Sequence, residues 1–351
     1  MRSPFKDIRL TALPVKLFEI PDGVLLKRGA SEMKIAGPGA TDAVKTVLDA
    51  TRTGASLNDI KKLFTRPSLP HVEKLVHELI ERRLLIPSDD SDTRVHEKDN
   101  HTDIFYWHFR ETTEGVSARL NKIRFVIIGI NYISRQLAIA LTACGHRNFE
   151  VVDHPRQRNI NLFDENGHLN NDEWPPRLAR PSERKDDQAA ELGDCAIVTS
   201  DFGGQEAVRH WNKVCLERGK PFMPVILKNM VGYVGPLVIP GETPCYECLY
   251  YRQRSHTMDE SESLADRMAF EAQQVAGFHP VMAAMLGDIA AFELTRFYGG
   301  GMPARRIGGL IEVNLLAARM TERHVLKVPR CIACSPLHRH SCTNLSKETF
   351  S

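Results

Sequence analysis

The sequence lacks several features that would place it in common classes of protein. No apolar run among its 351 residues reaches the ~18 residues of a membrane-spanning helix, and residues 1–14 lack the apolar core of a signal peptide. Lysine and arginine (46) nearly balance aspartate and glutamate (44), so no excess charge favours nucleic acid or an anionic membrane as a partner. We therefore expect a cytoplasmic protein, and in that compartment paired cysteines favour metal binding over disulfides.

Two C-x-x-C pairs are the most specific motif that is present. Cys245 and Cys248 form the first pair, and Cys331 and Cys334 repeat the spacing after 82 intervening residues. Four thiolates suit a tetrahedral zinc ion and leave no open position for water or substrate, so we predict a structural zinc site. Two redox motifs, or simply buried cysteines, are the alternatives. The other four cysteines are interpreted as small buried residues: Cys144, Cys195, Cys215 and Cys342.

A polar, charged segment at residues 88–103 predicts a linker between two domains. Residues 1–90 would form the smaller one, with strands at 24–27 and 32–35, followed by three helices. The first helix would be capped by Thr41 or Asp42, and the second by Ser56 with Ile60 and Leu63 facing inward. The third has apolar residues at helical spacing: Val72, Leu75, Val76, Leu79 and Ile80. This order predicts a winged helix-turn-helix domain.

DNA binding by this domain is disfavoured by the charge of its third helix. Glu73, Glu78 and Glu81 would face the phosphates if that helix entered a groove. We therefore expect no nucleic-acid partner.

The remainder of the chain predicts an α/β domain at residues 122–351, after a linker and connecting helix at 91–121. An apolar run, a turn at Gly129, a helix and a second strand ending at Asp153 form a βαβ unit, and a mainly parallel, doubly wound sheet follows. The loop after Gly129 matches a glycine-rich phosphate-binding loop poorly, because Asn131, Tyr132 and Ser134 occupy positions where such a loop has glycines. The sequence thus predicts a degenerate nucleotide site.

The stretches DGVLLKRGASEMKI, LDATRTGASLNDIKKLF and LVHELIERRLLIP resemble the PqqD-like peptide recognition elements of ribosomally made, modified peptides. The resemblance implies that a leader peptide adds as a strand to the sheet, in a groove beside the third helix. Its contacts would come from seven residues: Met33, Lys34, Ile35, Val72, Leu75, Val76 and Leu79. A domain that only stabilises the chain is the alternative.

Residues 122–336 resemble the ThiF-type adenylyltransferases related to ubiquitin-activating enzymes, in VIIGINYIS, VVDHP, VTSDF, GYVGPLVIPGETPCYECL and VPRCIACSP. The resemblance implies that Gly129, Asp153 and Asp201 mark the nucleotide site, with Asp201 at the magnesium-binding position of active members. The segment after Asp153 matches the arginine-glutamine pattern of the family only loosely, with Arg156, Arg158 and Asn161 as candidates, and it offers no convincing lysine.

With both parts taken together, the chain resembles the ThiF-like partner proteins of azole-forming peptide cyclodehydratases. This resemblance implies a subunit that binds the leader of a precursor peptide and presents the peptide to a separate YcaO-type protein, which uses ATP for ring closure. The alternative is an active ATP- and magnesium-dependent adenylyltransferase, with Asp201 as its catalytic residue, that acts on a peptide or carrier-protein carboxylate. The helix expected within residues 277–300 suggests a homodimer.

Overall fold

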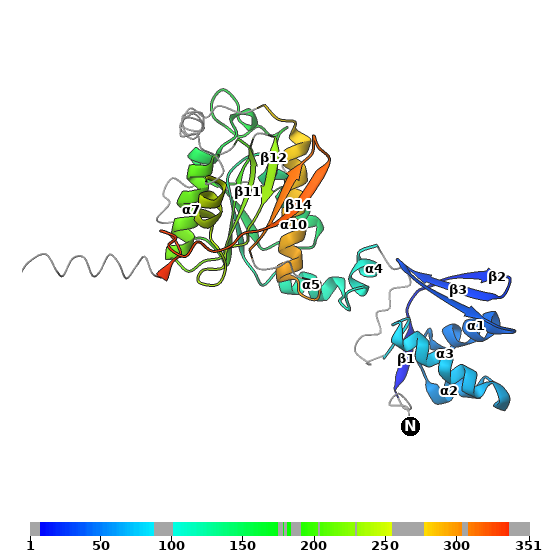
Figure 1. The fold of residues 1–351 in the computed structure, drawn as a ribbon. Coiled ribbons are helices and arrows are strands. Elements are labelled where there is room, and N and C mark those ends of the chain that lie inside the picture. Colours follow the sequence, from blue (N-terminus) through cyan, green and yellow to red (C-terminus); the bar gives the residue numbers. More distant parts are fainter. Residues whose placement is uncertain are drawn as a thin grey trace, which may run out of the picture. The chain divides into compact units, whose positions relative to one another are not determined.

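The computed structural model describes residues 8–87, 101–174, 178, 181–183, 191–202, 204–228, 230–254, 277–303 and 308–336. Most of the predicted linker and Cys342 lie outside these residues. The chain divides into two compact units, 1–113 and 114–351 (Figure 1). No helix in the described ranges is long and apolar enough to cross a membrane.

The small unit contains two three-stranded antiparallel sheets. In one, β1 (Arg9–Ala12) lies between β5 (Ala55–Ser56) and β6 (Leu85–Pro87). In the other, β2 (Lys16–Ile20), β3 (Gly23–Arg28) and β4 (Ser31–Ala36) pair in sequence order, which leaves β4 at an edge. The predicted strands at 24–27 and 32–35 are confirmed, and they pair with each other as the β3–β4 hairpin.

Three helices complete the small unit in the order expected for a winged helix. They are α1 (Ala40–Thr51), α2 (Leu57–Lys62) and α3 (Leu69–Glu81), with a 3-10 turn at Arg66–Ser68 between the last two. Ser56 caps α2, as predicted, through a capping box with Asp59.

Two details of the helix prediction are wrong. α1 is preceded by Gly39, whose left-handed backbone (φ 74°) starts the helix before Thr41 and Asp42. Leu63 is 56% exposed, because α2 has already ended when the chain reaches it.

The predicted connecting helix is two short helices, one in each unit. α4 (His101–Trp107) packs on the small unit through Trp107, whose ring lies 5.0 Å from the Arg28 guanidinium. The Trp107 indole N–H donates to the Arg83 carbonyl, and the Arg83 guanidinium donates to the Trp107 carbonyl. α5 (Thr113–Leu120) begins after Arg110, whose positive φ of 63° interrupts the helical path.

The large unit is built on an eight-stranded sheet in the order β14-β13-β12-β11-β10-β7-β8-β9. The strands from β9 to β11 in this order are parallel, and the other three pair antiparallel, which confirms the predicted mainly parallel sheet. Their bounds are β7 Phe125–Ile128, β8 Phe149–Asp153, β9 Ser182–Glu183, β10 Cys195–Ser200, β11 Phe222–Lys228, β12 Val231–Val234, β13 Gly309–Asn314 and β14 Arg319–His324.

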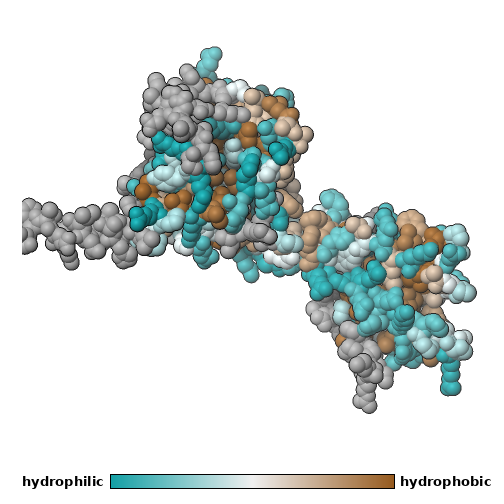
Figure 2. All heavy atoms as spheres, viewed as in Figure 1, coloured by the Kyte–Doolittle hydropathy of each residue, from teal (hydrophilic) through white to brown (hydrophobic). Residues whose placement is uncertain are grey.

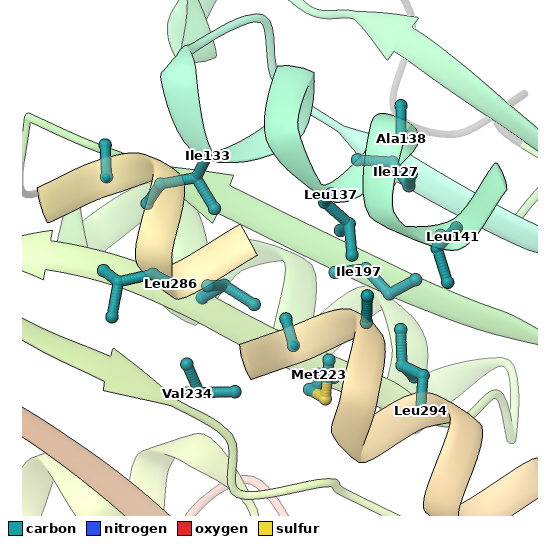
Figure 3. Packing of buried hydrophobic residues seen from close by; sticks show 14 of the residues in the cluster. Ile127, Ile133, Leu137, Ala138, Leu141, Ile197, Met223, Val234, Leu286 and Leu294 are labelled. Atoms are coloured by element: carbon teal, nitrogen blue, oxygen red, sulfur yellow. The ribbon is translucent and has the colours of Figure 1, made fainter. Parts of the chain in front are cut away.

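Helices cover both faces of this sheet. α6 (Tyr132–Ala143) and α10 (Pro280–Tyr298) pack on one face, where Leu137 and Leu294 meet Ile197 of β10 and Met223 of β11 (Figure 3). α7 (Gln205–Glu217) and α8 (Tyr246–Arg254) cover the other face. Apolar strands buried on both sides explain the continuous hydrophobic runs FVII and CAIVTS.

One buried histidine in this unit predicts a pH dependence of stability. His146 is fully buried, with ring centroids 4.5 Å from Phe125 and 6.0 Å from Phe149, and burial lowers its pKa. The folded state resists protonation, so its stability falls as the pH drops through the ordinary histidine pKa of about 6.5. We expect acidification from about pH 7.5 to 5.5 to lower the melting temperature of wild type more than that of His146→Leu, measured by differential scanning fluorimetry. Identical pH profiles would contradict this prediction.

Candidate functional site

The four predicted metal ligands lie together in the large unit. The sulfurs of Cys245, Cys248, Cys331 and Cys334 all lie within 4.8 Å of one another. Three of their separations are 3.8 Å (245 to 248), 3.6 Å (245 to 331) and 3.5 Å (248 to 334). A tetrahedral ion with metal–sulfur bonds of about 2.3 Å places its sulfurs about 3.8 Å apart. The cluster can therefore hold a metal ion, and three of its four cysteines are buried.

Helix α7 holds the first cysteine pair in place. The Asn212 side chain accepts a hydrogen bond from the Tyr246 N–H at 2.9 Å, and Arg209 makes two bonds to Glu247 at 2.8 and 2.7 Å. The Glu247 side chain is only 5% exposed, and its bonds to Arg209 raise the pKa of that guanidinium. The Val328 N–H approaches the Cys248 sulfur at 3.4 Å. Such contacts orient metal ligands, and the spacing of the cysteines does not predict these contacts.

The three residues predicted to mark a degenerate nucleotide site, Gly129, Asp153 and Asp201, lie at the carboxyl ends of the parallel strands β7, β8 and β10. The chain runs from β7 through α6 to β8 on one side, while β10 pairs with β7 on the other, so the strand order reverses between β7 and β10. Doubly wound sheets bind nucleotides at such a point, against the N-terminus of the first helix. Gly129 lies there with φ 111°, and a Cβ on it would come within 2.8 Å of the Thr199 carbonyl oxygen.

The loop after Gly129 is occupied by internal hydrogen bonds. Asn131 caps α6: its side chain accepts from the Ser134 N–H and donates to the carbonyl and hydroxyl oxygens of Thr199. Asp201 is 1% exposed and accepts from the Tyr132 N–H and the Asn159 side chain, each at 2.9 Å. Burial raises the pKa of Asp201 to about 6. A carboxylate of the chain itself therefore lies where a phosphate would meet the helix N-terminus.

The second acidic position is also paired within the chain. Arg158 binds Asp153 with two hydrogen bonds, from Nε at 2.6 Å and from Nη2 at 2.8 Å. Both oxygens of this carboxylate therefore accept from Arg158, at a strand end where dinucleotide-binding folds often place an acidic residue for a ribose hydroxyl. Between the short turns Pro155–Gln157 and Ile160–Leu162, the Asn159 side chain accepts from the Asn161 N–H. The side chain of Arg156 lies outside the described part of the chain.

The small unit has a groove of about 920 Å³ bordered by β4, α1 and α3. Of the residues predicted to contact a peptide, Lys34, Ile35, Val72 and Leu75 line it. Sequence periodicity missed further lining residues, among them Leu63, Phe64, His71 and Glu78.

The other three predicted contacts lie in the hydrophobic core. Met33, Val76 and Leu79 are 4%, 2% and 0% exposed, and none of them lines the groove. They pack β4 and α3 against the interior of the small unit.

Comparison with known proteins agrees with this architecture. Residues 185–333 match the model of the ThiF family. The sequence has no match among curated proteins.

Solved structures of similar fold cover both units. E. coli MccB with succinimide has a TM-score of 0.64 at 16% identity, covering 93% of this chain and 99% of that one. MccB with AMPCPP and MccA gives 0.64 at 17% identity, with the same coverage. The heterocyclase TruD gives 0.61 at 18% identity; the match covers 98% of this chain but 45% of TruD. The structures of similar fold confirm the predicted ThiF-like fold, and the match to the ThiF family model lies within the large unit.

Proposed function

We propose that this protein binds the leader of a ribosomally made precursor peptide and presents the peptide to a separate YcaO-type cyclodehydratase for thiazoline or oxazoline formation. The groove beside the free strand β4 supports peptide binding, because an open edge offers unpaired backbone groups and the groove can take alternate side chains. Structures of similar fold include MccB in complex with MccA and the heterocyclase TruD. The proposed site of action is the cytoplasm.

The observation that carries the recruiting role is that the groups at the predicted nucleotide site are hydrogen-bonded within the chain. The Tyr132 N–H at the start of α6 is bonded to Asp201, and the carboxylate of Asp153 is bonded to Arg158. A nucleotide phosphate at this N–H would have to displace Asp201 from it, and both oxygens of the Asp153 carboxylate already accept from Arg158. ATP activation is therefore assigned to the partner chain.

The metal that we propose for the cysteine cluster is a structural zinc ion. All four ligands would be thiolates, which zinc accepts in tetrahedral sites, and the sulfur separations fit that geometry. The ion would join the segment that begins α8 to the segment after β14. It would contribute to folding and leave no position for substrate.

An active adenylyltransferase is the second candidate function. It is favoured by the retention of Asp153 and Asp201 at the carboxyl edge of the sheet and by the similar fold of MccB, one structure of which contains ATP. In that case Asp201 would release the Tyr132 N–H and bind magnesium, and the chain would activate a peptide or carrier-protein carboxylate.

Reconstitution tests the recruiting role. The full chain, a YcaO-type protein, ATP and the precursor peptide are combined, and loss of one water mass per ring is followed by mass spectrometry. We expect ring formation to slow at least about tenfold without this chain, because the leader would no longer be held near the catalytic site. Equal rates with and without it would contradict the proposal.

We also propose that the protein forms a homodimer through α10. Val281, Met285 and Phe292 lie four and seven residues apart, on one side of this helix, and are 60%, 38% and 44% exposed. Figure 2 shows hydrophobic residues gathered over the first turns of α10. We expect light scattering to give twice the chain mass of 39.6 kDa for wild type and a single chain mass for Met285→Glu. A monomeric wild type would contradict the proposal.

A further inference from the structure

The strand β4 presents a defined set of backbone groups to an incoming peptide, if the proposed leader binding is correct. In an antiparallel strand, the N–H and C=O of one residue point to one side and those of the next residue to the other. The Gly37 N–H donates to the Asp22 carbonyl at 2.9 Å, on the side of β3. The Glu32 carbonyl instead accepts from Arg82 of the α3 terminus. By this alternation, the outward groups belong to Glu32, Lys34 and Ala36.

Arg82 is a charged group at the Glu32 end of this edge that contacts the backbone of β4. Its guanidinium lies 3.4 Å from the Glu32 carbonyl oxygen, which is a long hydrogen bond to a neutral acceptor. The Glu32 carboxylate is paired with Lys27 at 2.6 Å, and no carboxylate among the described residues pairs with Arg82. A charged acceptor would replace the carbonyl favourably, because hydrogen bonds between ions are about twice as strong as neutral ones.

The apolar part of the groove lies toward the other end of β4. Ala36 lines it together with Phe64, Val72 and Leu75. Since side chains on one face of a strand recur every second residue, a peptide side chain at the Ala36 end and one at the Glu32 end lie about four residues apart.

We propose that the bound peptide is an extended strand paired with Glu32, Lys34 and Ala36, with an apolar side chain in the groove and a carboxylate about four residues away that binds Arg82. Arg82 leaves the Glu32 carbonyl when the strand adds, and that carbonyl then accepts a peptide N–H. This arrangement fixes the register of the strand and selects an acidic residue.

The test uses the full chain and a positional-scanning library of fluorescein-labelled decapeptides, read by fluorescence anisotropy. We expect wild type to prefer Asp or Glu at one position with an apolar residue four positions away, and Glu→Gln in the peptide to weaken binding about fivefold. Arg82→Met keeps the aliphatic stem and should remove that difference. Arg52→Met, an exposed arginine at the end of α1, should retain it.

The outcomes separate the two proposals. Peptide binding with an acidic preference that survives in Arg82→Met, or that is lost in Lys34→Met instead, overturns the role of Arg82 and leaves leader binding intact. Peptide binding by wild type without any preference for an acidic residue also overturns the role of Arg82 and leaves leader binding intact. If no peptide binds to wild type, the proposed function fails and this inference fails with it.

Discussion

Replacement of Cys245 by serine is expected to release the metal and destabilise the large unit. The four sulfurs are close enough for one tetrahedral ion, and loss of one thiolate leaves an incomplete site among buried groups. Structural zinc binding in small domains is worth about 10–16 kcal/mol, so loss of even a quarter of it would remove about 3 kcal/mol and lower the melting temperature by roughly 10 °C. Metal analysis of wild type should give about one zinc per chain, and that of Cys245→Ser close to none.

Cys144→Ser is the matched control, because Cys144 is partly buried at the end of α6 and is not a member of the cluster. It should keep the full zinc content and shift the melting temperature little. A zinc-free wild type of normal stability would contradict the assignment of the metal, and so would a Cys245→Ser variant that retains its zinc.

A charge placed in the groove is expected to abolish most peptide binding. Leu63 lines the groove and is 56% exposed, so Leu63→Glu should change the stability of the small unit by less than about 0.5 kcal/mol. Covering a leucine side chain with a ligand contributes about 1.5–3 kcal/mol, so its loss should raise the Kd of the best library decapeptide by about 10- to 100-fold. Anisotropy titration of the full chain measures the change.

Leu316→Glu makes the same chemical change at a residue 73% exposed in the large unit. It should leave peptide affinity unaltered. Affinity retained by Leu63→Glu would contradict binding in this groove, which Leu63 and β4 line together.

The cysteine site shows how far the sequence alone can lead. Matched C-x-x-C spacing is a local signal, and it predicted the cluster formed by Cys245, Cys248, Cys331 and Cys334. The clamp between Arg209 and Glu247 joins residues 38 positions apart and depends on how α7 and α8 pack on the sheet. No local pattern contains that information.

The residues that line the groove could be predicted only in part from the periodicity of apolar residues. Apolar spacing identified the buried side of α3, but it could not divide that side between core and groove, so Val76 was placed with Leu75 although only Leu75 lines the groove. Leu63 was predicted to face inward because it continues the spacing of α2, yet the helix ends one residue earlier.

At the predicted nucleotide site, the sequence identified the acidic residues but not their hydrogen-bond partners. The absence of loop glycines predicted a degenerate site, and Asp153 and Asp201 were expected there as acidic groups at strand ends. Their partners, Arg158 and Asn159, lie within one irregular segment whose path no repeat or period describes. The spacing of these residues in the sequence therefore does not reveal that both acids are bonded within the chain.

ATP–pyrophosphate exchange distinguishes a recruiting subunit, which binds peptide and performs no phosphate chemistry, from an adenylyltransferase. The purified full chain is incubated with ATP, magnesium, labelled pyrophosphate and the precursor peptide, beside an active adenylyltransferase. For a recruiting subunit we expect exchange at the background rate for wild type and for Asp201→Ala alike. Robust exchange by wild type that Asp201→Ala abolishes would contradict the recruiting role and establish the adenylyltransferase instead.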